Sequence, residues 1–159
     1  MKKAFYRGKD VATGEWLYGA LLHEENGIDL LEKEEKAFII NKQHPTWQEI
    51  DVKTIGAQVF VKTDLIDGQD FLTFSGDIIE RECAYHFYGS DICGNVKERA
   101  LIEWHDEYAG YYVGETPLWV WILNGTHQDG FRYKFNGIVG NVHDHLELLE
   151  EVEQEESPK

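Results

Sequence analysis

The clearest structural pattern in the chain lies in Glu80-Arg81-Glu82-Cys83-Ala84-Tyr85-His86-Phe87-Tyr88. Its side chains alternate in character. Cys83, Tyr85 and Phe87 fall on one face of an extended chain, and Glu80, Glu82, Ala84 and His86 fall on the other. A period of two residues is typical of a half-buried strand in an antiparallel sheet. The stretch therefore predicts a β-strand that turns one face toward a core.

Further strands are predicted on both sides of this one. In Arg99–His105, the side chains of Ala100, Ile102 and Trp104 oppose the polar ones. The run Leu118–Leu123 is apolar on both faces, which predicts a central strand with Trp119 and Trp121 aligned on one face. The other predicted strands are Lys3–Arg7, Glu15–Leu22, Ala37–Asn41, Gln58–Lys62, Gly110–Val113, Phe131–Phe135 and Gly137–Val142.

Turn-forming dipeptides separate many of these runs. Each pairs Asn or Asp with Gly, and these residues accept a positive φ at low cost, as tight hairpins require. Many short strands at this spacing predict a mainly β fold, a small barrel or a sandwich of antiparallel strands. The dipeptides are Asn26-Gly27, Asp67-Gly68, Asn124-Gly125, Asp129-Gly130 and Asn136-Gly137.

The organisation of the chain follows from its length and its C-terminal end. A chain of 159 residues predicts one β-rich unit over residues 1–150, or two small subdomains that share a core. A short helix is predicted near the end, with Asp144 as its N-cap and Glu147 completing a capping box. Leu146, Leu149 and Val152 then recur along one side. Residues 151–159 form an acidic tail.

Charge and composition restrict the partners and the location. The formal net charge is −15, which disfavours direct binding of nucleic acid by a broad basic face. The longest apolar run is too short to cross a membrane, and the basic N-terminus lacks the apolar stretch of a signal peptide. We therefore expect a cytoplasmic protein, not membrane-bound, whose Cys83 and Cys93 are reduced thiols.

Two histidines are the candidates for a metal site. His143 and His145 lie two residues apart, so their imidazoles share one face if the chain there is extended. A third ligand, such as His105 or His127, would complete a site for a metal-dependent hydrolase. The alternative is that Asp144 caps the helix and the imidazoles are surface groups. No cofactor is predicted.

Aromatic side chains are dense between Trp104 and Trp121. Exposed rings there would form a subunit interface or a ledge that binds a sugar, a base or a peptide. The alternative, which we favour, is that large rings fill the small core of a β fold. The candidates for the interface or ledge are Tyr111, Tyr112, Trp119 and Trp121.

Three separated blocks, in order along the chain, carry a resemblance to a known protein family. The first is Tyr6-Arg7-Gly8-Lys9 with Gly14-Glu15-Trp16-Leu17-Tyr18-Gly19. The second is Val52-Lys53-Thr54-Ile55-Gly56 with Phe74-Ser75-Gly76-Asp77-Ile78-Ile79. The third is Ile138-Val139-Gly140-Asn141-Val142-His143-Asp144 with Glu147-Leu148-Leu149. Together these blocks resemble the YopX family of phage and prophage proteins. The stretch from Arg81 to Phe135 carries no block, and Leu146 stands where the family usually has proline.

The resemblance implies an all-β structure of small barrels and a phage or prophage gene product in a bacterial cytoplasm. It supplies no catalytic residue. Gly56, Gly76 and Gly140 are predicted to lie at strand ends or bulges, and Asp77 to hydrogen-bond the backbone of its own turn.

The sequence thus favours a binding protein over an enzyme. We expect a non-enzymatic phage accessory protein, a homo-oligomer that binds a host or phage macromolecule through aromatic surface and sheet edges. One alternative is the small metal-dependent hydrolase or ligand-binding enzyme that would use His143 and His145. Another is an acidic mimic of nucleic acid that binds a basic protein.

Overall fold

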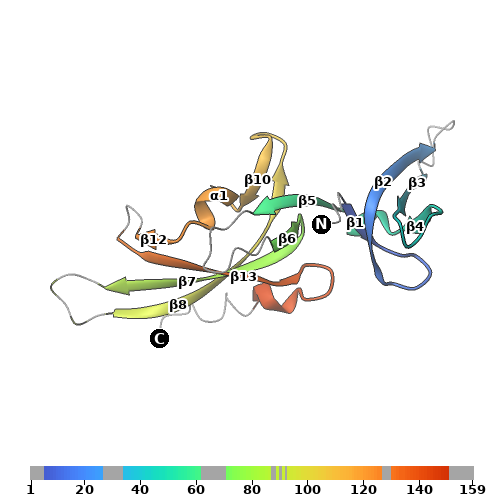
Figure 1. Cartoon of the computed structure of the whole chain (residues 1–159). Coiled ribbons are helices and arrows are strands. Elements are labelled where there is room, and N and C mark those ends of the chain that lie inside the picture. Colours follow the sequence, from blue (N-terminus) through green and yellow to red (C-terminus); the bar gives the residue numbers. More distant parts are fainter. Residues whose placement is uncertain are drawn as a thin grey trace. The chain divides into compact units, whose positions relative to one another are not determined.

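The computed structural model describes residues 6–26, 34–61, 71–86, 89, 91, 93–126 and 130–150. The chain divides into two units, Met1–Gln58 and Val59–Lys159. Both are built of antiparallel strands, which confirms the mainly β prediction, and none of the sheets closes into a barrel within these described ranges. Figure 1 shows the elements of each unit.

The first unit is one antiparallel sheet with strand order β4-β3-β2-β1-β5. The strand β5 begins beside β1, where Ala57 pairs with Tyr6, and then continues into the second unit. The elements are β1 (Tyr6–Lys9), β2 (Trp16–Asn26), β3 (Glu34–Ile40), β4 (Gln48–Ile50), the 3-10 helix η1 (Val52–Thr54) and β5 (Gly56–Val61).

The core of the first unit forms from alternate positions of its strands. Ala37 and Ile39 in β3 are fully buried and pack with Leu17 and Ile50. Gly8 lies so close to Ile50 that a Cβ at this position would overlap the isoleucine side chain. The small residue therefore lets β1 approach the core closely.

The second unit contains a four-stranded sheet, order β12-β13-β7-β8, and a three-stranded sheet, order β11-β10-β9. Figure 1 shows β7 running alongside both β8 and β13. The strand β5 continues here as the neighbour of β6. The elements are β6 (Phe71–Phe74), β7 (Asp77–His86), β8 (Cys93–Leu101), β9 (Glu103–His105), β10 (Gly110–Val113), β11 (Thr116–Pro117), α1 (Leu118–Trp121), β12 (Gly125–Thr126) and β13 (Arg132–Asn141).

One hydrophobic core joins the two sheets of the second unit. Ile79 and Phe135 come from the larger sheet, Val113 from the smaller one, and Trp121 from α1 between them. Ile102, the residue between β8 and β9, is fully buried in this core. Its backbone bonds to the start of β7, where Ile102 N donates to Asp77 O at 3.0 Å, and to the turn before it, where Ile102 O accepts from Gly76 N at 2.9 Å. The strand predicted over Arg99–His105 is therefore split in two at Ile102.

The run Leu118–Leu123 is not a central strand, and this prediction is wrong. It forms the helical turn α1, in which Ile122 N donates to Leu118 O at 3.1 Å. Residues three apart share a helix face, so Leu118 and Trp121 both enter the core. Trp119 points away and is 67 % exposed, so the two tryptophans do not share a face.

Asn136-Gly137 is not a hairpin turn either. The predicted strands Phe131–Phe135 and Gly137–Val142 are one strand, β13, which pairs with β7 along its whole length. The register shifts between Phe135 and Gly137, so Asn136 is an extra residue in a β-bulge. Gly137 has a φ of 118°, a backbone conformation that residues with a side chain rarely adopt.

The predicted C-terminal helix is present over residues 147–150, but it does not start directly after Asp144. The side-chain oxygen of Asn141 accepts the backbone N–H groups of His143 at 3.0 Å and Asp144 at 3.1 Å. The carboxylate of Asp144 accepts a hydrogen bond from Asn141 Nδ2 at 3.1 Å. Val152 and the acidic tail over residues 151–159 lie outside the described residues, as do the dipeptide Asp67-Gly68, Gly27 and Asp129.

Predictions for single residues are also confirmed. Gly56 begins β5, Gly76 has a φ of 85° in the turn before β7, and Gly140 lies at a register shift in β13. Asp77 is buried, and its carboxylate accepts the backbone N–H of Phe74 at 2.8 Å. Both cysteines are free thiols.

Candidate functional site

The hairpin formed by β9 and β10 exposes aromatic rings on both of its faces. On one face, Trp104 lies opposite Tyr111, and the two rings meet edge to face with their centroids 5.1 Å apart. Tyr111 packs against the core, while Trp104 is 50 % exposed. Trp104 Nε1 donates a hydrogen bond to Asp106 Oδ1 at 2.8 Å, which fixes the indole at the start of the turn.

The other face of the hairpin carries a cluster of three rings. His105 lies 6.1 Å from Tyr108 and 5.1 Å from Tyr112, and the two tyrosines are 5.2 Å apart, between ring centroids. Tyr108 sits in the turn and is 56 % exposed. Ala109, with a φ of 47°, is in the left-handed region, which lets the turn close directly behind Tyr108.

The charge around these rings is of one sign. No lysine or arginine occurs between Arg99 and Arg132, a segment that includes the whole hairpin. Glu103, Asp106 and Glu107 are exposed next to the rings. The hairpin thus combines apolar ring surface with negative charge, a combination suited to a cationic partner.

The structure separates the four residues predicted to form an interface or a ledge. Tyr111 and Tyr112 are adjacent in β10 and therefore point to opposite faces. Trp119 is exposed on α1, and Trp121 is buried. Trp104 and Tyr108, which belong to the same aromatic-rich stretch but not to the four selected residues, are the most exposed rings of the hairpin. The alternation in Arg99–His105 placed Trp104 on the same face as Ala100 and Ile102. It did not indicate that a turn begins directly after His105.

Arg81 explains why Trp121 is held inside. Its guanidinium carbon lies 3.9 Å from the ring centroid of Tyr133 and 4.4 Å from that of Trp121. The same group donates to the backbone oxygen of Trp121 at 3.1 Å and forms an ion pair with Glu98. These contacts fix α1 against β7 and β13, so Trp121 is a structural residue.

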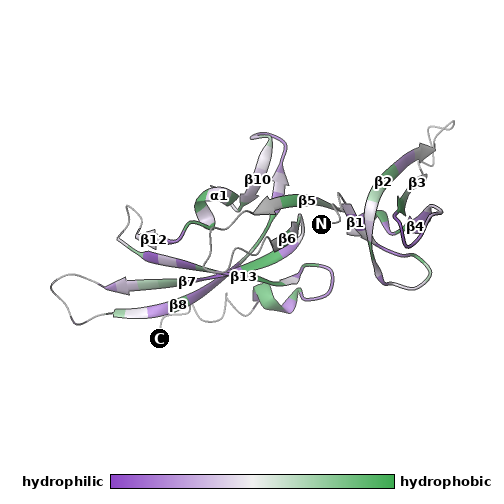
Figure 2. Ribbon diagram, in the orientation of Figure 1, coloured by the Kyte–Doolittle hydropathy of each residue, from purple (hydrophilic) through white to green (hydrophobic). Residues whose placement is uncertain are grey.

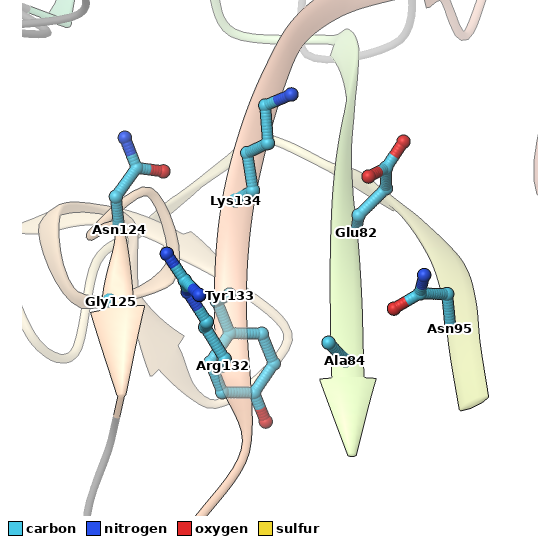
Figure 3. Close-up of a pocket in the computed structure, with 8 residues that line it drawn as sticks. All are labelled: Glu82, Ala84, Asn95, Asn124, Gly125, Arg132, Tyr133 and Lys134. Carbon is cyan, nitrogen blue, oxygen red and sulfur yellow. The ribbon is translucent and has the colours of Figure 1, made fainter. Parts of the chain in front are cut away.

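A second candidate site lies on the four-stranded sheet, on the face opposite to the one that Trp121 packs against. It is an open pocket of about 570 Å³, and Figure 3 shows the side chains around it. Its lining residues come from β7, β8, β12, β13 and the residue just before β12. They include Glu82, Ala84, Asn95, Asn124, Arg132 and Lys134. Sequence reasoning missed this pocket, although the alternation of Arg132 and Lys134 in β13 was a readable signal for a polar face.

Some of the charged side chains beside the pocket form ion pairs with one another, and others do not. Glu80 is buried and forms ion pairs with Arg99 at 3.0 Å and Lys97 at 3.6 Å. Burial alone would raise the pKa of Glu80, but the hydrogen bonds from Arg99 and Asn136 and the two nearby cations outweigh it and lower that pKa. Glu80 is therefore an ionised structural group.

The predicted metal pair lies in the turn after β13. His143 and His145 are both exposed. The Nδ1 atom of His145 accepts the backbone N–H of Asn141 at 3.3 Å. The described residues contain no group of three metal-ligating side chains, His105 lies in the hairpin cluster, and His127 is outside the described residues. The metal site stays a prediction.

No helix in the described part of the chain has the length and apolar character needed to cross a membrane. No curated protein and no solved structure matches the chain. The comparison with protein families gives one match, to the family described as YopX protein, and it covers residues 5–150. This span includes every strand of both units and both candidate sites, so the chain belongs to the YopX protein family.

Proposed function

We propose that this YopX family member is a non-enzymatic accessory protein that binds a basic protein through its β9–β10 hairpin. The observation that carries the proposal is the coincidence of exposed rings and unbalanced negative charge. Trp104 and Tyr108 are at least half exposed, and every charged residue from 100 to 131 is acidic. Large exposed rings are a common source of binding energy at protein interfaces.

The hairpin is arranged so that binding costs little conformational entropy. Tyr108 is held by ring contacts with His105 and Tyr112, and Trp104 by its contact with Tyr111 and its hydrogen bond to Asp106. Side chains that are already ordered lose less rotamer freedom when a partner covers them. Arginine is the side chain best suited to these rings, because a guanidinium stacks on aromatic faces and pairs with carboxylates.

The partner is proposed to be a host or phage protein in the bacterial cytoplasm. A second copy of the chain is the main alternative occupant, in keeping with the expected homo-oligomer. The negative charge of the hairpin also favours fast, salt-sensitive association with a basic surface.

Affinity purification of the tagged full chain from bacterial cells tests the proposal. The variant to compare carries Trp104→Ser and Tyr108→Ser, and Trp47→Ser is the control because Trp47 is an exposed tryptophan of the first unit. We expect a basic protein to be retained by the wild type and by the control, to be lost from the hairpin variant, and to be released by raised salt. Retention of the same proteins by all three chains would contradict the proposal.

The oligomeric state of the same three chains separates the two occupants. If the hairpin binds a second copy, sedimentation will show an assembly for the wild type and the Trp47→Ser control and a monomer for the hairpin variant. A basic partner of another sequence leaves the mass of the purified chain equal in all three.

Two other roles stay predictions. A metal-dependent enzyme that uses His143 and His145 requires stoichiometric metal, which elemental analysis of the purified protein measures. An acidic mimic of nucleic acid requires that a nucleic acid compete with it for the basic partner, and this competition can be measured directly once a partner is known.

A further inference from the structure

The outer face of the four-stranded sheet is built from three rows of side chains across β13, β7 and β8. The register places Arg132, Ala84 and Asn95 in one row. Lys134, Glu82 and Lys97 form the next row. In the last row, Glu80 pairs with Arg99 and receives a hydrogen bond from Asn136 in the bulge. Figure 2 shows hydrophilic residues along β8 and the first part of β13.

The first row explains why this face is hollow. Ala84 carries only a methyl group, and it stands between the long side chain of Arg132 and the amide of Asn95. Because Ala84 is small, it leaves a space above it. The longer side chains of the neighbouring row line one side of this space. The resulting pocket, about 570 Å³, has the size of sites that bind small molecules, which range from roughly 300 to 1,000 Å³. Figure 3 shows the short side chain of Ala84 between Arg132 and Asn95.

The cations of the pocket lack carboxylate partners in the described chain. Glu80 is already paired with Lys97 and Arg99 in the last two rows. Lys134 lies directly across from Glu82, yet neither it nor Arg132 forms an ion pair with any residue that the structure describes. The lining holds two cations, Arg132 and Lys134, and one carboxylate, Glu82, so it carries a net positive charge in a chain whose net charge is −15. An anionic ligand would neutralise that positive charge.

We infer that this pocket binds a small phosphorylated sugar, free or as part of a nucleotide. Arg132 and Lys134 hold the phosphate, because a guanidinium and an ammonium match its charge and its oxygen acceptors. Glu82, a carboxylate without an ion pair in the described chain, accepts hydrogen bonds from sugar hydroxyl groups. This site is independent of the β9–β10 hairpin.

The amide side chains of Asn124 and Asn95 would orient the ligand in the pocket. Asn124 Oδ1 already accepts the backbone N–H of Phe135 at 2.7 Å, so its Nδ2 is the group that faces a ligand as a donor. Asn95 is exposed at the other side of Ala84 and offers both a donor and an acceptor. This asymmetry favours a ligand with polar groups at both ends over inorganic phosphate alone.

Titration calorimetry of the full chain with three probes tests the inference. The probes are inorganic phosphate, ribose 5-phosphate and adenosine monophosphate. We expect saturable binding of at least one of the two phosphorylated sugars, and binding weaker by about tenfold or more for inorganic phosphate. If only the nucleotide binds tightly, the base is part of the ligand; if both bind equally, the sugar phosphate is sufficient.

Variants tie the binding to the pocket. Arg132→Ala and Lys134→Ala should each weaken binding of the better probe by roughly tenfold or more, since each removes a charge-assisted hydrogen bond. Ala84→Leu should weaken it similarly by filling the hollow without changing the charge. Lys42→Ala, an exposed lysine of the first unit, removes the same charge and should leave the affinity unchanged.

Three results would overturn the inference. They are absence of saturable binding of either phosphorylated sugar at millimolar concentration, equal affinity of the wild type and the pocket variants, and equal loss in Lys42→Ala.

A single-stranded oligonucleotide is a further probe. Tighter binding of longer oligonucleotides would assign the face to nucleic acid and would also reject the small ligand. Circular dichroism of each variant confirms that it is folded.

Discussion

At the scale of single residues, the blocks that define the family resemblance build the scaffold. Arg7 places its guanidinium carbon 4.7 Å from the ring centroid of Trp16, so two separate parts of the first block contact each other. Gly8 allows close packing under Ile50, and Asp77 fixes the turn before β7. None of these residues lines the pocket or the aromatic cluster. The resemblance therefore reports the fold more directly than the function.

Asp77 gives the clearest stability prediction among them. Asp77→Ala removes the acceptor for the buried N–H of Phe74, and a buried donor left without a partner costs roughly 1–3 kcal/mol. Denaturant unfolding should show that loss. Asp77→Asn keeps a side-chain oxygen in place and should lose less. Equal stability of Asp77→Ala and the wild type would mean that the turn does not depend on this bond.

Glu80 gives a prediction for pH dependence. Its pKa in the folded protein is lowered from the ordinary value of 4.5, so between the two pKa values the unfolded chain binds more protons. The stabilisation is therefore fully present above about pH 4.5 and is lost as the pH falls through the lower, folded-state pKa. Unfolding of Glu80→Gln, followed against pH, should show a smaller acid-dependent loss than the wild type.

Glu82→Gln is the matched control for this measurement. Glu82 lies on the same strand and the same face as Glu80, and it forms no ion pair with a described residue. The variant should keep the acid-dependent loss of the wild type. An unchanged pH dependence in Glu80→Gln would show that the carboxylate of Glu80 does not stabilise the folded state.

At the scale of elements, α1 shows where sequence reasoning reaches its limit. A run that is apolar at every position has no period, so it fits a central strand as well as a buried helical turn. Here the tertiary structure decides, because Leu118 and Trp121 fill the core three residues apart. By contrast, the alternation in β7 was readable from the sequence: Cys83 is buried as predicted, although Glu80, predicted on the other face, is buried as well.

The geometry of α1 predicts that replacing Trp121 destabilises the fold much more than replacing Trp119. Trp121→Ala removes a buried ring and should lower the unfolding free energy by roughly 3–5 kcal/mol. Trp119→Ala changes an exposed residue and should stay within about 0.5 kcal/mol of the wild type. Denaturant titrations of both variants measure this. Similar losses for the two would favour the strand, in which both rings share a face.

The turns show the same limit in another form. Asn124-Gly125 and Asn136-Gly137 have the same composition, yet the first leads into β12 and the second is a bulge inside β13. Both glycines have positive φ, so the dipeptides correctly indicated the local backbone. The pairing of β13 with β7 on both sides of the bulge is a long-range contact, which local composition does not encode.

At the scale of the whole molecule, the two candidate sites lie in the stretch that the resemblance leaves bare. The hairpin and all the lining residues of the pocket fall between Arg81 and Phe135, whereas the signature blocks lie before and after this stretch. The sequence predicted the mainly β class, the turn at Gly76 and the hydrogen bond from the backbone of that turn to Asp77. It did not predict the pocket, because the pocket depends on the pairing of β7 with β13, which are distant in the sequence. For the hairpin it proposed Tyr111 and Tyr112, but not that Trp104 and Tyr108 are its most exposed rings.

The proposed function makes its most direct prediction for the purified chain and a short arginine-rich peptide. A heteronuclear NMR titration should shift the amide signals of residues 103–113 most, and Trp104→Ser with Tyr108→Ser should remove those shifts. A lysine-rich peptide of equal charge should bind more weakly, because ammonium groups stack less well on rings. Shifts spread over other acidic segments, or unchanged shifts in the hairpin variant, would contradict a binding site at the β9–β10 hairpin.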